Sequence, residues 1–264
     1  FQLTRTTVLK AGVGLYSQAP QPQDLIPALF GNPNLTYQRS FQYSVGVDQK
    51  LPHDWDLGVT LYDKRMWQLE AMSRLTDPMG NPLYLSNGGK GRSYGFELLL
   101  RRQIMKGFYG WIAYTLSRST RLDDPSEPTY QYGWHLYDFD QTHILTLIAS
   151  YQTEHNWTFG ARVRYVSGDP FTPFVNGIFN ANNGQYVCVA GDPDSGRAPA
   201  FFQGDVRVDR RWVYDKWIFT GYLDVQNVTN RQNPEAIFPN FNCNGYATLT
   251  GLPVFPTIGL RVEF

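Results

Sequence analysis

Long segments in which apolar and polar residues alternate recur along the whole chain, and they constrain its fold most strongly. Side chains of an extended strand point in turn to opposite faces. In GDVRVDRRW, residues 204–212, one face therefore carries Val206, Val208 and Trp212. The other face carries four charges of mixed sign, on Asp205, Arg207, Asp209 and Arg211. About ten segments follow this pattern, and none has a convincing helical period.

The length of these segments favours a membrane environment. Each runs for roughly 10–12 residues, whereas strands of soluble proteins usually have about 5–6. About ten residues, tilted by about 45°, cross a bilayer. We therefore predict an all-β, antiparallel transmembrane β-barrel with apolar side chains facing lipid and charged ones facing a polar lumen. The alternative is a soluble β-sandwich with the charged faces in water.

The connections between the segments alternate strictly between short and long. Short turns are expected at residues 51–55, 103–108, 152–156 and 213–216. Long, structureless loops are expected at residues 17–38, 68–91, 121–140, 169–200 and 229–253. Such loops argue against a compact soluble domain, but outer-membrane barrels have short periplasmic turns and long extracellular loops.

Composition agrees with this interpretation. The 264 residues include 23 basic and 23 acidic side chains, so no basic excess suggests nucleic acid as a partner. No apolar run is long enough for a transmembrane helix, and no signal peptide is visible at the start. Aromatic residues make up 16% of the chain, and many lie near strand ends, where membrane barrels carry aromatic girdles. These are Phe41, Tyr43, Trp55, Tyr94, Phe108, Tyr151, Trp157, Trp212 and Trp217.

The last strand resembles the assembly signal of bacterial outer-membrane proteins. The chain stops at Phe264, with Ile258, Leu260 and Val262 on the same predicted face. An ordinary terminal strand is the alternative interpretation. If the signal holds, Phe264 is the residue through which the barrel-assembly machinery recognises the strand.

Taken in order, several segments resemble the barrel of TonB-dependent outer-membrane receptors. Gly95 and Glu97 occupy an S-x-G-x-E-L strand in RSYGFELLLRR, and FDQTHILTLIASY resembles a D-x-x-H strand entry. The other matching segments are FGNPNLTYQRSFQYSVGVDQKL (30–51), YGWIAYTLSRS (109–119), VRYVSGDPFTP (163–173), residues 205–230 and PTIGLRVEF (256–264). Order and spacing carry the resemblance, which covers almost the whole chain.

The resemblance implies a barrel of about 22 strands plugged by an N-terminal domain. Such receptors capture scarce ligands outside the cell and import them with energy relayed by TonB. Residues 1–264 contain about ten predicted strands and no plug or TonB-contacting box. We therefore expect a C-terminal portion of a larger receptor; a small barrel that closes by itself is the alternative. An open edge cannot face lipid with unpaired backbone groups.

The charged face supplies the candidate lumen residues, which we expect to line the ligand path and to pair with one another. They are Glu97, Arg101, Arg162, Arg164, Asp205, Arg207, Asp209, Arg211 and Asp224.

Two long loops hold the only cysteines, Cys188 and Cys243. Both loops are predicted to be extracellular, where disulfides form, so we expect a bridge rather than two free thiols. The segment YQYGWHLYDFD supplies the loop candidates Trp134, His135, Tyr137 and Asp138. These could stack on a ligand ring or bind a cation, but packing within the loop is the preferred interpretation.

The chain is not expected to be an enzyme. His143 is the only plausible general base, and no Gly-x-Ser-x-Gly elbow is present. An outer-membrane hydrolase and a passive porin-like channel remain as alternative functions. We expect no metal and no cofactor. The expected location is the outer membrane of a Gram-negative bacterium, with lipid, a TonB-type energy transducer and a small ligand of unknown type as partners.

Overall fold

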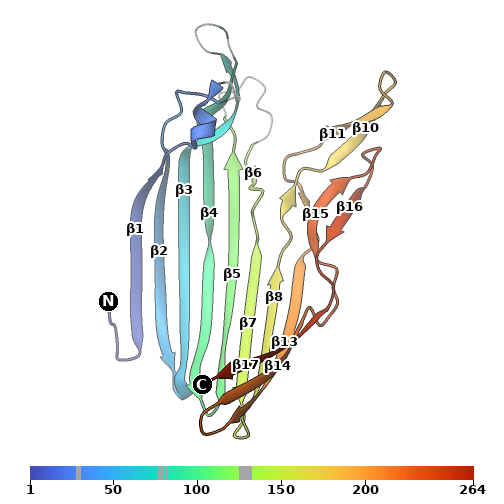
Figure 1. The fold of residues 1–264 in the computed structure, drawn as a ribbon. Coiled ribbons are helices and arrows are strands. Elements are labelled where there is room, and N and C mark those ends of the chain that lie inside the picture. Colours follow the sequence, from blue (N-terminus) through green and yellow to red (C-terminus); the bar gives the residue numbers. More distant parts are fainter. Residues whose placement is uncertain (28–30, 77–79, 81, 125–132) are drawn as a thin grey trace.

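Ten long strands form one antiparallel sheet in which neighbours along the chain are neighbours in space (Figure 1). The computed structural model describes residues 1–27, 31–76, 80, 82–124 and 133–264. The strands are β1 (Thr7–Gln18), β2 (Gln38–Leu51), β3 (Trp55–Thr76), β4 (Pro82–Met105), β5 (Phe108–Leu122), β7 (His143–Gln152), β8 (Trp157–Val166), β13 (Phe201–Val213), β14 (Ile218–Gln226) and β17 (Phe255–Glu263). This confirms the predicted fold class and the expected number of about ten strands.

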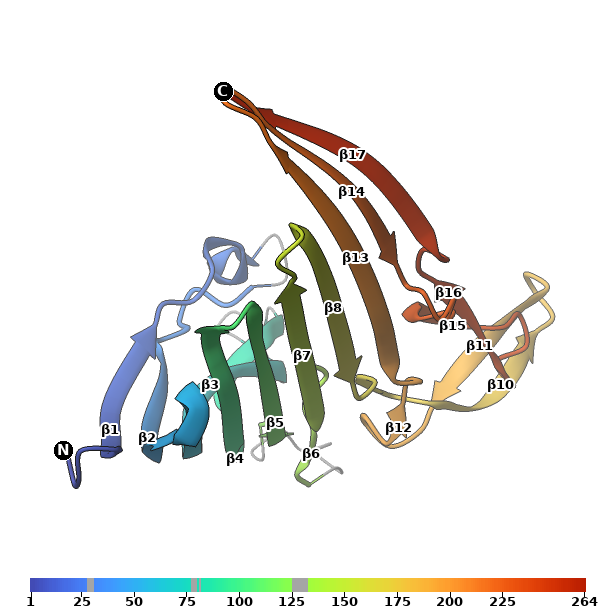
Figure 2. The same ribbon diagram turned by 90° about the horizontal axis from the view of Figure 1, so that it is seen from below.

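The sheet is curved and open. β1 and β17 form its two edges, and β6 (His135–Leu136) adds a short pairing on β5. Figure 2 shows the curved sheet from below, with the first and last strands far apart. Within the described residues no pairing joins β1 to β17, so the sheet is open.

Tight turns join the strands at one end of the sheet, which we call the short-turn end (Figure 1). A 3₁₀ turn, η3 (Pro52–Asp54), separates β2 from β3. Between β4 and β5, Gly107 has a φ of +80°, and a Cβ there would come within 2.1 Å of the carbonyl oxygen of Gln152. Only glycine tolerates both the left-handed backbone and this close approach. The predicted short turns are therefore confirmed.

At the opposite end, the loop end, the prediction of structureless loops was wrong in three places. Residues 68–91 mostly continue β3 and β4, which have 22 and 24 residues and rise as one long hairpin. Their pairing shifts register three times between Trp67 and Leu75, and Gln68 has a φ of 55°. Each bulge interrupts the two-residue period. The alternation that identified β3 and β4 nearer the short-turn end therefore disappears here.

Short hairpins replace the other two expected loops. Between β8 and β13 lie β10 (Phe174–Asn180) paired with β11 (Gln185–Ala190), and β9 (Pro170–Phe171) paired with β12 (Gly196–Arg197). Between β14 and β17, β15 (Pro234–Pro239) pairs with β16 (Tyr246–Thr250). The segment after β1 contains the 3₁₀ turn η1 (Pro22–Leu25). Part of the expected loop 121–140 lies outside the described residues.

The apolar side chains of the sheet are not buried in a core. Among the described residues only four hydrophobic side chains are buried: Leu35, Ala71, Val166 and Cys243. Val13, Val45, Leu61 and Leu260 are instead 55–72% exposed. A water-soluble sandwich would cover such residues with a second sheet. No helix in the described part of the chain is long and apolar enough to cross a membrane.

Candidate functional site

All nine candidate lumen residues lie on one face of the sheet, which we call the polar face. Residues directly opposite each other in antiparallel strands share a face. The register links Arg101 to Trp111, Trp111 to Ile148, Ile148 to Arg162 and Arg162 to Asp205, and it pairs Arg207 with Asp224. The face is polar at most positions, with Trp111 and Ile148 among its apolar members.

Asp205 connects three parts of this face. Its carboxylate accepts a hydrogen bond from Nε of Arg162 at 2.7 Å and another from Nε2 of Gln203 at 2.8 Å. It also accepts the backbone N–H of Asn227 at 2.9 Å. Asp205 is only 8% exposed, so all these donors reach a nearly buried charge. The result is a fixed junction between β8, β13 and the chain that leaves β14.

Arg207 forms a second cluster farther along β13. Its guanidinium pairs with Asp209 at 2.8 Å and with Asp224 on β14 at 3.6 Å. It also lies over the ring of Tyr222, 4.0 Å from the centroid. Three of the four charges predicted along β13, on Asp205, Arg207 and Asp209, are thus ion-paired, and Asp205 and Arg207 have partners on neighbouring strands.

The remaining lumen candidates stand apart from these clusters. Arg101 pairs with Asp56 on β3 at 3.2 Å. Arg164 lies over the ring of Phe201, 5.5 Å from the centroid. Glu97 and Arg211 are exposed on the polar face. The nine residues thus share a surface but do not form a single cluster.

A cleft of about 340 Å³ opens at the loop end of the polar face. Arg164 and Phe201 form its wall on the sheet, and Phe171 and Glu235 contribute from the loop hairpins. A guanidinium, a carboxylate and two aromatic rings in one concave surface can hold a ligand that is partly aromatic and carries charge.

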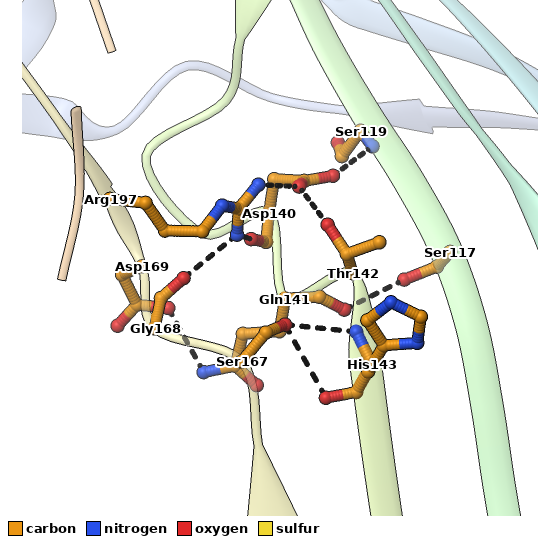
Figure 3. A network of polar contacts seen from close by, with 10 residues as sticks. All are labelled: Ser117, Ser119, Asp140, Gln141, Thr142, His143, Ser167, Gly168, Asp169 and Arg197. Carbon is orange, nitrogen blue, oxygen red and sulfur yellow. Dashed lines mark hydrogen bonds and ion pairs between the residues drawn. The ribbon is translucent and has the colours of Figure 1, made fainter. Parts of the chain in front are cut away.

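A buried polar network anchors the loops beside this cleft (Figure 3). Asp140, 1% exposed, is at its centre. Its carboxylate accepts hydrogen bonds from the Ser119 backbone N–H at 2.5 Å, from Oγ1 of Thr142 at 3.0 Å and from Nη2 of Arg197 at 2.8 Å. Arg197 also donates to the backbone carbonyls of Asp140 and Gly168, each at 2.8 Å.

The network extends into the strands next to it. Ser167 Oγ accepts the backbone N–H of His143 at 2.9 Å, and Gln141 donates to Asp169 at 3.1 Å. Arg197, which lies in β12, is thus linked through this network to the loop-end termini of β5, β7 and β8 (Figure 3). The network fixes the hairpin loop 169–200 against the sheet.

The loop candidates Tyr137 and His135 contact other residues of the chain, whereas Trp134 is largely exposed. Arg121 of β5 lies over the ring of Tyr137, 3.8 Å from the centroid. His135 of β6 is the cross-strand backbone partner of Arg121. Trp134 is 54% exposed. Asp138 lies near Asp194 and acts on it electrostatically. Burial and the negative charge of Asp138 together raise the pKa of Asp194 to about 6, although His135 opposes the shift.

Cys188 and Cys243 are joined by a disulfide with a Cα–Cα distance of 5.4 Å. The bond links β11 to the turn between β15 and β16, across 55 residues of sequence. Tyr186 and Phe241 pack edge to face beside it, with 5.5 Å between ring centroids. The disulfide therefore staples the paired part of the β10–β11 hairpin to the turn of the β15–β16 hairpin.

Two other predicted residues have clear positions. Phe264 is fully exposed after β17, at the short-turn end (Figure 1). His143, the only candidate general base, has its Nδ1 2.8 Å from the hydroxyl of Tyr114. Among the described residues no group of three or more His, Cys, Asp or Glu side chains could hold a metal ion.

The sequence analysis missed three residues that organise the site. Asn227, 4% exposed with a φ of 51°, supplies the backbone N–H to Asp205. The NVTN motif could have indicated it, because asparagine tolerates the left-handed region. Asp140 was noted only within an aromatic stretch and as the acidic residue of the D-x-x-H strand entry, without its contacts. Arg197 lies in a segment without periodicity, and no signal in the sequence predicts its contacts.

A long antiparallel arc with one exposed apolar face and one ion-paired face is the wall of a transmembrane β-barrel. The sequence matches the family described as TonB dependent receptor-like, beta-barrel over residues 1–228. The chain belongs to this family, which is one of receptors and not of enzymes. No curated protein matches the sequence.

Several solved receptors share the fold. The ferric-catecholate import receptor Fiu of E. coli K12 is 17% identical, with a TM-score of 0.62 over 99% of this chain and 33% of its own. The pyoverdine outer-membrane receptor FpvA of Pseudomonas aeruginosa PAO1 is 14% identical, with a TM-score of 0.67 over 100% and 35%. The FrpB iron transporter of Neisseria meningitidis is 16% identical, with a TM-score of 0.65 over 100% and 38%. This chain thus spans about a third of the length of these proteins.

Proposed function

We propose that the chain forms the C-terminal ten strands of an outer-membrane receptor of about 22 strands, which imports a ligand past a plug with TonB-derived energy. The long hairpins are extracellular, and the ligand is captured at the cleft beside Arg164. The observation that carries this proposal is the continuity of the polar face, which leads from the cleft through the Asp205 and Arg207 clusters to the short-turn end.

The chemistry of the cleft and the printed functions of the similar receptors support a ligand class. Fiu is an import receptor for ferric catecholates, and FpvA is bound to pyoverdine in its structure. Ferric chelates of this kind combine aromatic rings with charge. Arg164, Phe171 and Phe201 suit such a ligand by charge and stacking. We therefore assign the substrate class as charged, aromatic iron chelates.

The remaining partners follow from the membrane placement. Lipid contacts the apolar face, a TonB-type transducer acts through a plug outside this chain, and the barrel-assembly machinery recognises the strand that ends at Phe264. The outer membrane of a Gram-negative bacterium is the compartment in which these partners occur together.

Uptake of radiolabelled ferric catecholates by cells that carry the intact receptor tests the proposal. We expect saturable uptake that a protonophore abolishes. Arg164→Gln should raise the half-saturation concentration about tenfold, because it removes a charge-assisted contact. Lys216→Gln, in an exposed short turn, removes the same charge far from the cleft and should have no effect. Linear uptake that persists with the protonophore would instead indicate a passive channel.

A further inference from the structure

Five cations gather on the face opposite the lumen candidates, at the loop end of β2 to β5. We call Arg39, Arg65, Lys90, Arg92 and Arg118 the basic patch. The register places them in three successive rows across the strands: Arg39–Trp67–Lys90, Phe41–Arg65–Arg92 and Tyr43–Asp63–Tyr94–Arg118. All five basic side chains are exposed.

The patch carries a charge surplus that the residues described by the structure do not neutralise. Asp63 is the only acidic side chain in these rows. It is 7% exposed and accepts two hydrogen bonds from Arg92, at 2.6 and 3.0 Å, and a longer one from Arg65 at 3.4 Å. Within the described residues Arg39, Lys90 and Arg118 form no ion pair. Arg65 and Arg92 are direct cross-strand neighbours, an arrangement of like charges that is unfavourable without further counter-charge.

The position of the patch defines what can reach it. The next two rows toward the short-turn end are apolar: Val45–Leu61–Phe96–Leu116 and Val47–Val59–Leu98–Tyr114. Rows are two residues apart, or about 7 Å along a strand. Tyr43 and Tyr94 lie between the apolar rows and the cations, and Arg92 lies 4.6 Å from the ring centroid of Tyr94. The patch therefore borders the surface that contacts hydrocarbon, at the level where tyrosine marks an interface.

We propose that the basic patch binds the phosphate groups of lipid headgroups in the outer leaflet. The inference rests on the membrane placement proposed above. Arginine pairs with phosphate through directed, charge-assisted hydrogen bonds. The lipid chains of such a molecule extend along the apolar rows while its phosphates reach Arg39, Arg65 and Arg118. Asp63 holds Arg92 and Arg65 in place beneath the headgroup.

Native mass spectrometry of the intact receptor in detergent tests this, with a bis-phosphorylated glucosamine-based lipid as the probe and its dephosphorylated form as the comparison. We expect the double variant Arg39→Gln/Arg118→Gln to bind the phosphorylated lipid about thirtyfold more weakly, because each cation near an anionic surface contributes about 1 kcal/mol. The matched variant Lys64→Gln/Arg211→Gln removes two cations from the polar face and should bind like the wild type. Removing the phosphates from the lipid should weaken wild-type binding to a similar extent.

Three outcomes would overturn the proposal: equal binding by both double variants, equal affinity for both lipids, or displacement of the lipid by millimolar inorganic phosphate alone. Arg39→Lys/Arg118→Lys, which keeps the charge, should bind within a few-fold of the wild type. Reconstitution into phosphatidylcholine vesicles separates this result from the function proposed above. A receptor that enters the bilayer but ignores lipid phosphate refutes only the lipid site, whereas one that does not enter refutes the membrane placement itself.

Discussion

At the scale of single residues, nearly buried carboxylates hold the polar face and its loops in place. Asp205 and Asp140 each accept both side-chain and backbone donors, so each satisfies groups that would otherwise be left unpaired in a protected environment. Exposed pairs on the same face, such as Arg101 with Asp56, have weaker geometry. The stabilising effect should follow burial and not the number of ion pairs.

Asp205→Asn tests this difference. It leaves an amide that matches the shape of the carboxylate but removes the charge that Arg162 contacts, so we expect the free energy of unfolding to fall by about 2 kcal/mol. Asp56→Asn is the matched control, since its carboxylate is more exposed, and should cost less than about 1 kcal/mol. Denaturant unfolding of the intact protein in micelles, followed by tryptophan fluorescence, measures both. Equal losses would contradict the account.

Asp194 should make the stability of the loops depend on pH. Its pKa is about 6 in the folded protein and near 3.8 when unfolded, so between these values the folded state binds more protons. Stability should therefore fall as the pH rises from about 4 to about 6, and Asp194→Asn should remove that part of the dependence. Hydrogen exchange of residues 169–200 across this pH range is the measurement. A variant with the wild-type pH profile would refute the assignment.

At the scale of elements, the long sheet and the loop hairpins form separate hydrogen-bonded sheets. The long strands pair through continuous backbone ladders, whereas β10–β11 and β15–β16 pair only within themselves. The disulfide joins these two hairpins directly, and the Asp140 network joins the base of loop 169–200, which carries β10–β11, to the sheet. The disulfide should therefore stabilise the hairpins more than it stabilises the sheet.

Replacing both cysteines, Cys188→Ser/Cys243→Ser, tests this division. A loop of 55 residues gives the disulfide an upper limit of about 4 kcal/mol in the chain-entropy account. We expect faster proteolysis within residues 169–200 and 229–253, while the sheet keeps its heat-modifiable migration in detergent gels. Loss of that migration in the double variant would show that the staple supports the whole fold.

At the scale of the whole molecule, the sequence was informative wherever the two-residue period is intact. Alternation in strands such as β2 and β13 predicted the strands, the shared polar face and the short turns, because one sheet separates two different environments. It failed at the bulges near Gln68, where neighbouring residues lose their alternate directions, and in the short hairpins at the loop end. Contacts between residues far apart in sequence, such as Arg197 and Asp140, depend on how the loops fold back onto the sheet. Local sequence patterns do not predict such contacts.

The central claim is that the two faces of one sheet meet different media, and accessibility of spin labels measures this most directly. In the intact receptor without native cysteines, labels are placed one at a time at Ser44 and Val45 on β2, and at Arg207 and Val208 on β13. The account predicts collisions with oxygen, which is enriched in hydrocarbon, at Val45 and Val208, and collisions with a water-soluble nickel chelate at Ser44 and Arg207. Labels on both faces that respond equally to the nickel chelate would contradict it.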